Sequence, residues 1–118
     1  MKRIFGYELI LDLYRCKVSV LSDADALREY AIELCEIIKM KRYEEPILKY
    51  FGTAKSQTKG YTLVQLIETS DITGHFSEYW KRAYINIFSC KEFDHIKARD
   101  FTEKYFGAKN TRAMLVIR

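Results

Sequence analysis

The chain has 118 residues with a formal net charge of +4, and 48% of them are hydrophobic and 31% charged. This is the size and composition of one globular domain, spanning 1–118, that folds without disulfides or metal. The mild basic charge comes with no recognition motif, so no nucleic-acid partner is expected. The three cysteines have no paired spacing, which disfavours a disulfide framework or a zinc site. Without a signal peptide or a long apolar run, we expect a cytoplasmic protein and no membrane partner.

The first expected element is a strand over residues 5–16, FGYELILDLYRC, because three leucines alternate there with polar or mixed positions. A helix follows. Ser22 is its expected N-cap, an apolar stripe at helical spacing runs through it, and its end is expected near Lys41. The remaining pattern predicts strands and one further helix, capped by Asp94 and ended by Gly107. The expected strands are 45–51, 61–69, 83–90 and 112–118.

Two segments resemble each other: LDLYRC at 11–16 and INIFSC at 85–90. Both follow the pattern apolar–polar–apolar–aromatic–x–Cys, and each precedes an expected helix and then a strand. This repetition predicts two similar strand–helix–strand halves. The fold class is therefore α+β, a two-layer sandwich in which helices cover one face of an antiparallel sheet.

The segment ETSDITGH, residues 68–75, combines strand-forming residues with two acids, hydroxyl side chains and a histidine. Ser70, His75 and, further on, Cys90 are candidate reactive groups. Each also has an ordinary interpretation: Ser70 as the end of a strand, His75 as a surface histidine, and Cys90 as a small buried hydrophobe. Local spacing alone favours these ordinary interpretations, because it matches no common catalytic motif.

Nearly the whole chain nevertheless resembles the short prokaryotic, pyruvoyl-dependent S-adenosylmethionine decarboxylases. In that family a strand leads into a serine, a histidine follows five residues later, and a cysteine in a Phe-x-Cys pattern follows fifteen residues after that. Ser70, His75 and Cys90 reproduce both intervals, and FSC at 88–90 supplies the pattern. The first strand is also similar, with Gly6 in register.

The resemblance implies that the Ser70 hydroxyl attacks the carbonyl of Thr69 and that the chain is cut between residues 69 and 70. Residue 70 then becomes a pyruvoyl cofactor, which forms a Schiff base with an amino-acid-type substrate and accepts electrons as carbon dioxide leaves. By the same resemblance His75 and Thr62 assist the processing, and Cys90 is the general acid of the decarboxylation. Two copies are expected to pack through their sheets as a homodimer.

Several positions depart from the family pattern. Thr69 stands where the family has glutamate, Asp71 where it has histidine, and Asn86 where it has aspartate; Phe76-Ser77-Glu78 replaces a Thr-Trp-Pro run. Ser56 takes the place of an aromatic residue that stacks on adenine. Stacking of this kind is worth about 1–3 kcal/mol, so nucleoside binding requires a substitute. The candidates are Tyr50, Phe51, Tyr61 and Phe76.

Three functions remain open at this point. The first is decarboxylation of S-adenosylmethionine for polyamine synthesis. The second is a pyruvoyl-dependent arginine or ornithine decarboxylase of the same fold, and the third is an unprocessed, non-catalytic homologue that acts as a binding or regulatory subunit. For a cationic substrate, the expected ligands are acids near the reactive segment: Glu8, Asp12, Glu68 and Asp71.

Overall fold

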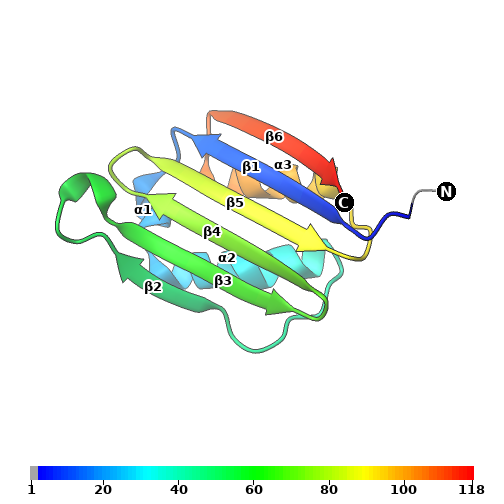
Figure 1. Cartoon of the computed structure of the whole chain (residues 1–118). Coiled ribbons are helices and arrows are strands. Elements are labelled where there is room, and N and C mark those ends of the chain that lie inside the picture. The colour runs from blue at the N-terminus through cyan, green and yellow to red at the C-terminus, as the bar shows by residue number, and fades with distance from the viewer. Residues whose placement is uncertain (1–2) are drawn as a thin grey trace.

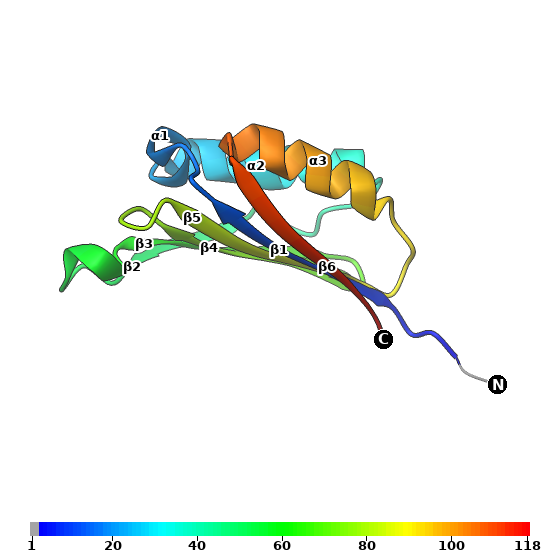
Figure 2. The same ribbon diagram turned by 90° about the horizontal axis from the view of Figure 1, so that it is seen from above.

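A computed structural model describes residues 3–118, which form one six-stranded antiparallel sheet and three α-helices. The helices all lie on one side of the sheet, and the other side is uncovered (Figures 1 and 2). The strands are β1 (Tyr7–Tyr14), β2 (Ile47–Phe51), β3 (Gly60–Ile67), β4 (Ser70–Ser77), β5 (Arg82–Ser89) and β6 (Asn110–Ile117). The helices are α1 (Val18–Leu21), α2 (Ala24–Ile37) and α3 (His95–Phe106), with a short 3-10 turn, η1 (Ser56–Thr58).

The strand order is β2-β3-β4-β5-β1-β6. Both edge strands, β2 and β6, follow helices along the chain, as the predicted strand–helix–strand units require. The two similar segments lie on the neighbouring strands β1 and β5 and meet where Leu11 pairs with Ile85. The predicted α+β class, with helices on one face of an antiparallel sheet, is confirmed.

Side chains alternate between the two faces of the sheet, as the pleat dictates. The helix face holds the core, in which Leu9, Leu11 and Leu13 of β1 pack with the buried residues of α2 and α3. Tyr30 of α2 is fully buried, and its hydroxyl is satisfied by Thr102 of α3 at 2.7 Å. The opposite side, called here the open face, carries exposed or half-buried side chains.

The long helix is shorter than predicted. Its N-cap is Asp23, whose carboxylate accepts hydrogen bonds from the next backbone amides, whereas Ser22 ends the short helix α1. The helix stops at Ile37, four residues before the expected end, because Lys39 adopts a left-handed conformation with φ of 57°. The apolar stripe through Ile38 continues the core beyond the helix itself.

One further expectation needs correction. The strand predicted for 61–69 ends at Ile67, and the polar segment after it forms a separate strand, β4, joined by the two-residue turn Glu68-Thr69. In α3, Ile96 is exposed. The buried positions of α3 are Ala98, Thr102 and Phe106. No helix in the described part of the chain is long and apolar enough to span a membrane.

Candidate active site

Ser70 is the first residue of β4 and lies directly after a tight turn. The turn residue Thr69 has a φ of 64°. A positive φ is unfavourable for a β-branched residue, because its Cβ is too close to the backbone. Such a conformation costs on the order of 1–3 kcal/mol and persists only where surrounding structure enforces it. The pairing of Ile67 with Ser70 on either side of the turn provides that enforcement.

The Ser70 hydroxyl donates a hydrogen bond to Ser89 Oγ at 2.8 Å. Ser89 is fully buried at the end of β5, directly opposite Ser70 in the sheet, and its Oγ also accepts the backbone N–H of Lys91 at 2.9 Å. The Ser70 hydroxyl is therefore held on the helix face beside the peptide bond that precedes it. The sequence prediction missed Ser89; the only signal for it was its place as the middle residue of the FSC motif.

Cys90 follows Ser89 and lies at the same end of the sheet as Ser70. It is half-buried, whereas the other two cysteines are buried in the core. Burial raises the pKa of the Cys16 thiol to about 11, and burial likewise raises the pKa of the Cys35 thiol to about 11. Because these two thiols are buried in the core, Cys90 is the most accessible of the three.

Gly6 allows β1 to approach the residues around Cys90. A Cβ at this position would lie 2.5 Å from the carbonyl oxygen of Ser89 and 3.1 Å from Cys90 Cα. Both contacts are with backbone atoms, which cannot move aside as a flexible side chain can. The match of Gly6 with the family's first strand thus has a steric reason in this structure.

His75 and Thr62 form a second polar pair, across strands β3 and β4. They are direct cross-strand partners, and Thr62 Oγ1 lies 3.3 Å from His75 Nδ1. Both side chains lie on the open face, and His75 is exposed. A cavity of about 230 Å³ adjoins them and is lined by aromatic residues that include Phe51, Tyr61 and Tyr84.

The structure brings the predicted residues together as two separate pairs. Ser70 and Cys90 share one end of the sheet, and Thr62 and His75 share the other. Ser70 and His75 are five residues apart on one strand, so at about 3.3 Å per residue they are separated by about 16 Å. Their odd spacing also places them on opposite faces, and a single chain therefore does not bring His75 to Ser70.

The predicted acidic residues also divide between the two ends. Asp71 and Glu8 flank Phe88 on the open face at the Ser70 end, through the register of β4, β5 and β1. Burial raises the pKa of Asp71, and the nearby charge of Glu8 raises it further. Glu8 also pairs with Arg118 at 2.9 Å. Asp12 lies in the row of His75, next to Tyr84, while Glu68 is exposed in the turn.

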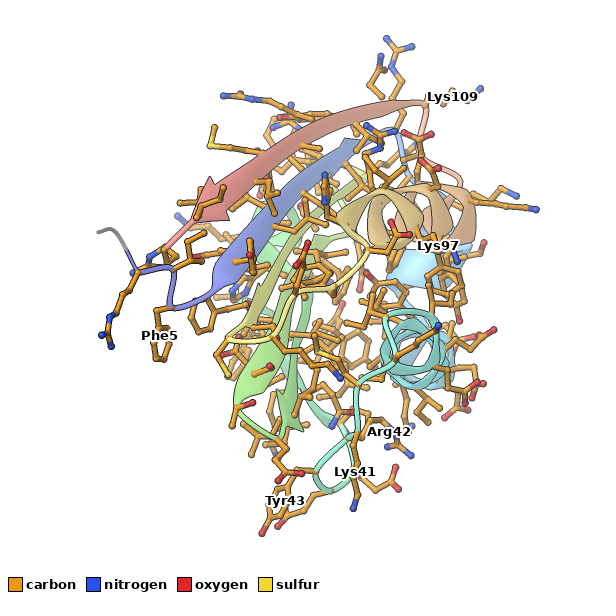
Figure 3. The ribbon with its side chains drawn as sticks, turned by 90° about the vertical axis from the view of Figure 1, so that its right-hand side faces the viewer. Phe5, Lys41, Arg42, Tyr43, Lys97 and Lys109 are labelled. Carbon is orange, nitrogen blue, oxygen red and sulfur yellow. The ribbon has the colours of Figure 1, made fainter. Side chains whose placement is uncertain are left out.

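The aromatic candidates for substrate binding have different positions. The Phe76 ring is 3% exposed and stacks on Phe106 in the core, with ring centroids 5.4 Å apart. Phe76 also lines the cavity beside Thr62 and His75, and its contact with substrate stays a prediction. A different aromatic pair lies beside the reactive end: Phe5 is 68% exposed and stacks on Phe88, with centroids 6.2 Å apart and planes inclined by 16°. Figure 3 shows Phe5 on the far side of the sheet from the helices.

Within residues 3–118, no group of three metal-ligating side chains gathers in one place. The described features define a two-layer α+β protein with a strained, serine-bearing hairpin and a neighbouring thiol. A family model for S-adenosylmethionine decarboxylase matches residues 7–118. The chain belongs to the S-adenosylmethionine decarboxylase family, a family of lyases, and the resemblance inferred from its sequence is confirmed.

The fold agrees with this assignment. The crystal structure of the adenosylmethionine decarboxylase from Aquifex aeolicus VF5 superimposes with a TM-score of 0.82 and 18% sequence identity. The match covers 99% of this chain and 92% of that chain. A search of curated protein sequences finds no significant match.

Proposed function

We propose that the protein is an S-adenosylmethionine decarboxylase that cuts its own backbone between Thr69 and Ser70 and serves polyamine synthesis. The observation that carries this proposal is the strained Thr69 directly before a hydroxyl fixed at the start of β4. Attack by Ser70 on the Thr69 carbonyl carbon would turn the amide that follows this strained residue into an ester. β-Elimination would then break the bond between Ser70 Oγ and Cβ and release fragment 1–69 with a terminal carboxylate. Hydrolysis of the dehydroalanine left at residue 70, with loss of ammonia, would give the keto group. Cleavage would then release that strain.

The residues around Ser70 suit a pyruvoyl group at this position. Such a group supplies a keto carbonyl that withdraws electrons from a bound amino acid. Ser89 offers a hydroxyl within hydrogen-bonding distance of the Ser70 side chain. We assign to Cys90, one residue further on, the donation of a proton to the substrate carbon after carbon dioxide leaves.

The open face at this end suits a substrate that carries a positive charge and a flat ring. Asp71 offers a carboxylate beside Phe88, Glu8 on its other side is paired with Arg118, and Phe5 adds an exposed aromatic ring stacked on Phe88. S-adenosylmethionine has a sulfonium cation and an adenine base, which these groups match. Phe5 and Phe88 would then take over the stacking that Ser56 cannot provide.

Processing by His75 and Thr62 requires a second copy of the chain. If two open faces pack together about a twofold axis that runs perpendicular to the strands, the Thr62–His75 end of one copy covers the open face of the other at its Ser70 end. It would then approach the Thr69–Ser70 peptide bond from the side opposite the Ser70 hydroxyl, which lies on the helix face. The open face carries exposed apolar side chains suited to such a contact. These include Phe51, Leu66, Tyr84 and Met114.

The test is an intact-mass measurement on the freshly made and the aged protein. We expect conversion to fragments 1–69 and 70–118, the second of which carries a keto group that reacts with carbonyl reagents. Ser70→Ala is the control and should stay in one piece. Release of carbon dioxide from S-adenosylmethionine, arginine and ornithine, assayed side by side, then identifies the substrate. A wild-type chain that stays intact would support a non-catalytic binding subunit instead.

A further inference from the structure

The turn that precedes Ser70 borders a cavity of about 280 Å³ on the helix side of the sheet. Three lysines, Lys39, Lys41 and Lys91, line this cavity together with Thr69 and Ser70. The lysines come from two segments that are distant in sequence, the loop after α2 and the loop after β5. Neither the family assignment nor the polar pairs described above give them a role.

Backbone contacts hold the first of these loops against the hairpin. The backbone N–H of Glu68 points to the carbonyl oxygen of Lys41 at 3.4 Å, and Tyr43 donates to the carbonyl oxygen of Leu66 at 2.9 Å. A β-bridge joins Arg42 to Ile67 between these two contacts. Figure 3, which faces this end of the sheet, shows Lys41 in the loop that follows α2.

The second loop is attached to the Ser70 hydroxyl itself. Lys91 donates its backbone N–H to Ser89 Oγ, the same atom that accepts the Ser70 hydroxyl. Lys91 is therefore connected to the Ser70 hydroxyl through one shared atom, Ser89 Oγ. Lys39 and Lys91 also line the adjoining cavity between α2 and α3, so the lysines form one continuous basic border.

Positive charge is in excess at the cavity beside Thr69 and Ser70, whereas Glu92 and Asp94 line the adjoining cavity. Every ion pair found within residues 3–118 uses an arginine as its cation, and none involves these lysines. The acidic side chain lining the cavity is Glu68, so three positive charges face one negative charge. Like charges gathered around a small cavity raise the potential there and favour any negative charge that develops inside it.

We propose that Lys39, Lys41 and Lys91 stabilise the oxyanion that forms during self-cleavage. This inference rests on the proposed function. When Ser70 Oγ bonds to the Thr69 carbonyl carbon, it loses its proton, and the π electrons of the carbonyl move onto its oxygen. Collapse of this five-membered ring breaks the carbon–nitrogen bond, and the nitrogen takes up a proton. The net change is an isomerisation of an amide into an ester.

A fixed cation near the developing oxyanion lowers the barrier, because its charge interacts more strongly with the transition state than with the neutral amide. The need for such a group follows from the geometry of one chain. Within it, Thr62 and His75 lie on the opposite face and about 16 Å away. The lysines are the cationic side chains that line the cavity at Thr69 and Ser70.

The test follows self-cleavage in variants made by cell-free synthesis, with intact chain and fragments quantified on denaturing gels over time. We expect Lys41→Met and Lys91→Met each to slow cleavage about tenfold, and the double variant about a hundredfold. Lys91→Arg keeps the charge and should restore most of the rate. Lys55→Met removes an exposed lysine in the loop around η1, away from this cavity, and should cleave at the wild-type rate.

The outcomes separate this inference from the proposed function. If the wild-type chain is never cut, the proposed function is wrong, and the inference that rests on it is wrong as well. If the wild type cleaves and a triple variant, in which Lys39→Met is added to the double variant, keeps pace with it, the lysines have no part in the step and the inference is overturned. A slow Lys91→Arg variant with an unchanged thermal unfolding midpoint would also overturn it, because the side chain would then act through shape rather than charge.

Discussion

The two ends of β4 differ in how they are built, and under the proposed function each end has a separate part in the reaction. At one end, Ser70 follows a strained turn and its hydroxyl is held on the helix face by Ser89. At the other end, His75 is exposed on the open face and contacts Thr62. The Ser70 hydroxyl is fixed within its own chain, whereas Thr62 and His75 face outward, and under the proposed function they act on a second copy.

The largest effect should come from variants in which the reactive residue is removed from only one end of β4. His75→Ala should slow self-cleavage by about 10²-fold or more, because a positioned proton carrier contributes about 10² to 10⁴. Co-expression of the His75→Ala chain with a Ser70→Ala chain should restore cleavage of the former, since the latter still provides His75 from its own open face. Tags of different mass identify which chain is cut. If the His75→Ala chain is cut no faster in the mixture than alone, the two ends do not act between copies.

Cys90→Ala tests the chemistry of the Ser70 end after cleavage. We expect normal formation of both fragments but a fall in kcat of about 10²-fold, because the proton donor is lost. The measurement is carbon dioxide release per mole of carbonyl group. Cys35→Ala is a matched control that removes a buried core thiol. Equal kcat values for Cys90→Ala and the wild type would show that another group donates the proton.

Gly6→Ala tests how tightly β1 fits against the reactive end. The added methyl group would meet Ser89 O at 2.5 Å, so the end of β5 has to shift. Overpacking of this kind costs about 1–3 kcal/mol, which should appear as a lower free energy of unfolding in urea. Cleavage should slow as well, because Ser89 holds the Ser70 hydroxyl. Unchanged stability would mean that the strand ends are free to move apart.

The smallest effect is expected from Thr69→Gly, because glycine adopts a positive φ without steric cost. In a Ser70→Ala background, which keeps the chain whole, we expect the free energy of unfolding to rise by about 0.5–1 kcal/mol. In the background that retains Ser70, cleavage should slow severalfold, since less strain is released. Faster cleavage would indicate that the bulk of Thr69, rather than its conformation, limits the reaction.

Much of this protein was predictable from its sequence. The alternation of leucines in residues 5–16 gave the first strand and its buried face, and the interval from Ser70 to Cys90 led to the family. These features are local or periodic, and periodicity survives in a single sequence. The helix C-cap at Gly107 was predicted for the same reason, because a left-handed residue after a helix favours glycine.

Other features depended on tertiary structure. The turn at Thr69 contradicts the residue's own preference and is imposed by the pairing of β3 with β4. Ser89 carries no sequence signal of its own and gains a role only as the cross-strand neighbour of Ser70. Phe76 was expected to contact substrate, but its ring is buried, because alternate residues of β4 face the helices and Phe76 is one of these.

The sequence by itself indicated most of the strands and helices and the candidate reactive residues, because both depend on short-range spacing along the chain. Only the tertiary structure decided which of these residues meet. Strand register and the two faces of the pleat place Ser70 with Ser89 and Thr62 with His75, and they separate the two pairs. Register is set by how strands pair across the sheet. Two residues five apart lie on opposite faces only if the segment between them is a strand, and the structure was needed to show that 70–75 is one.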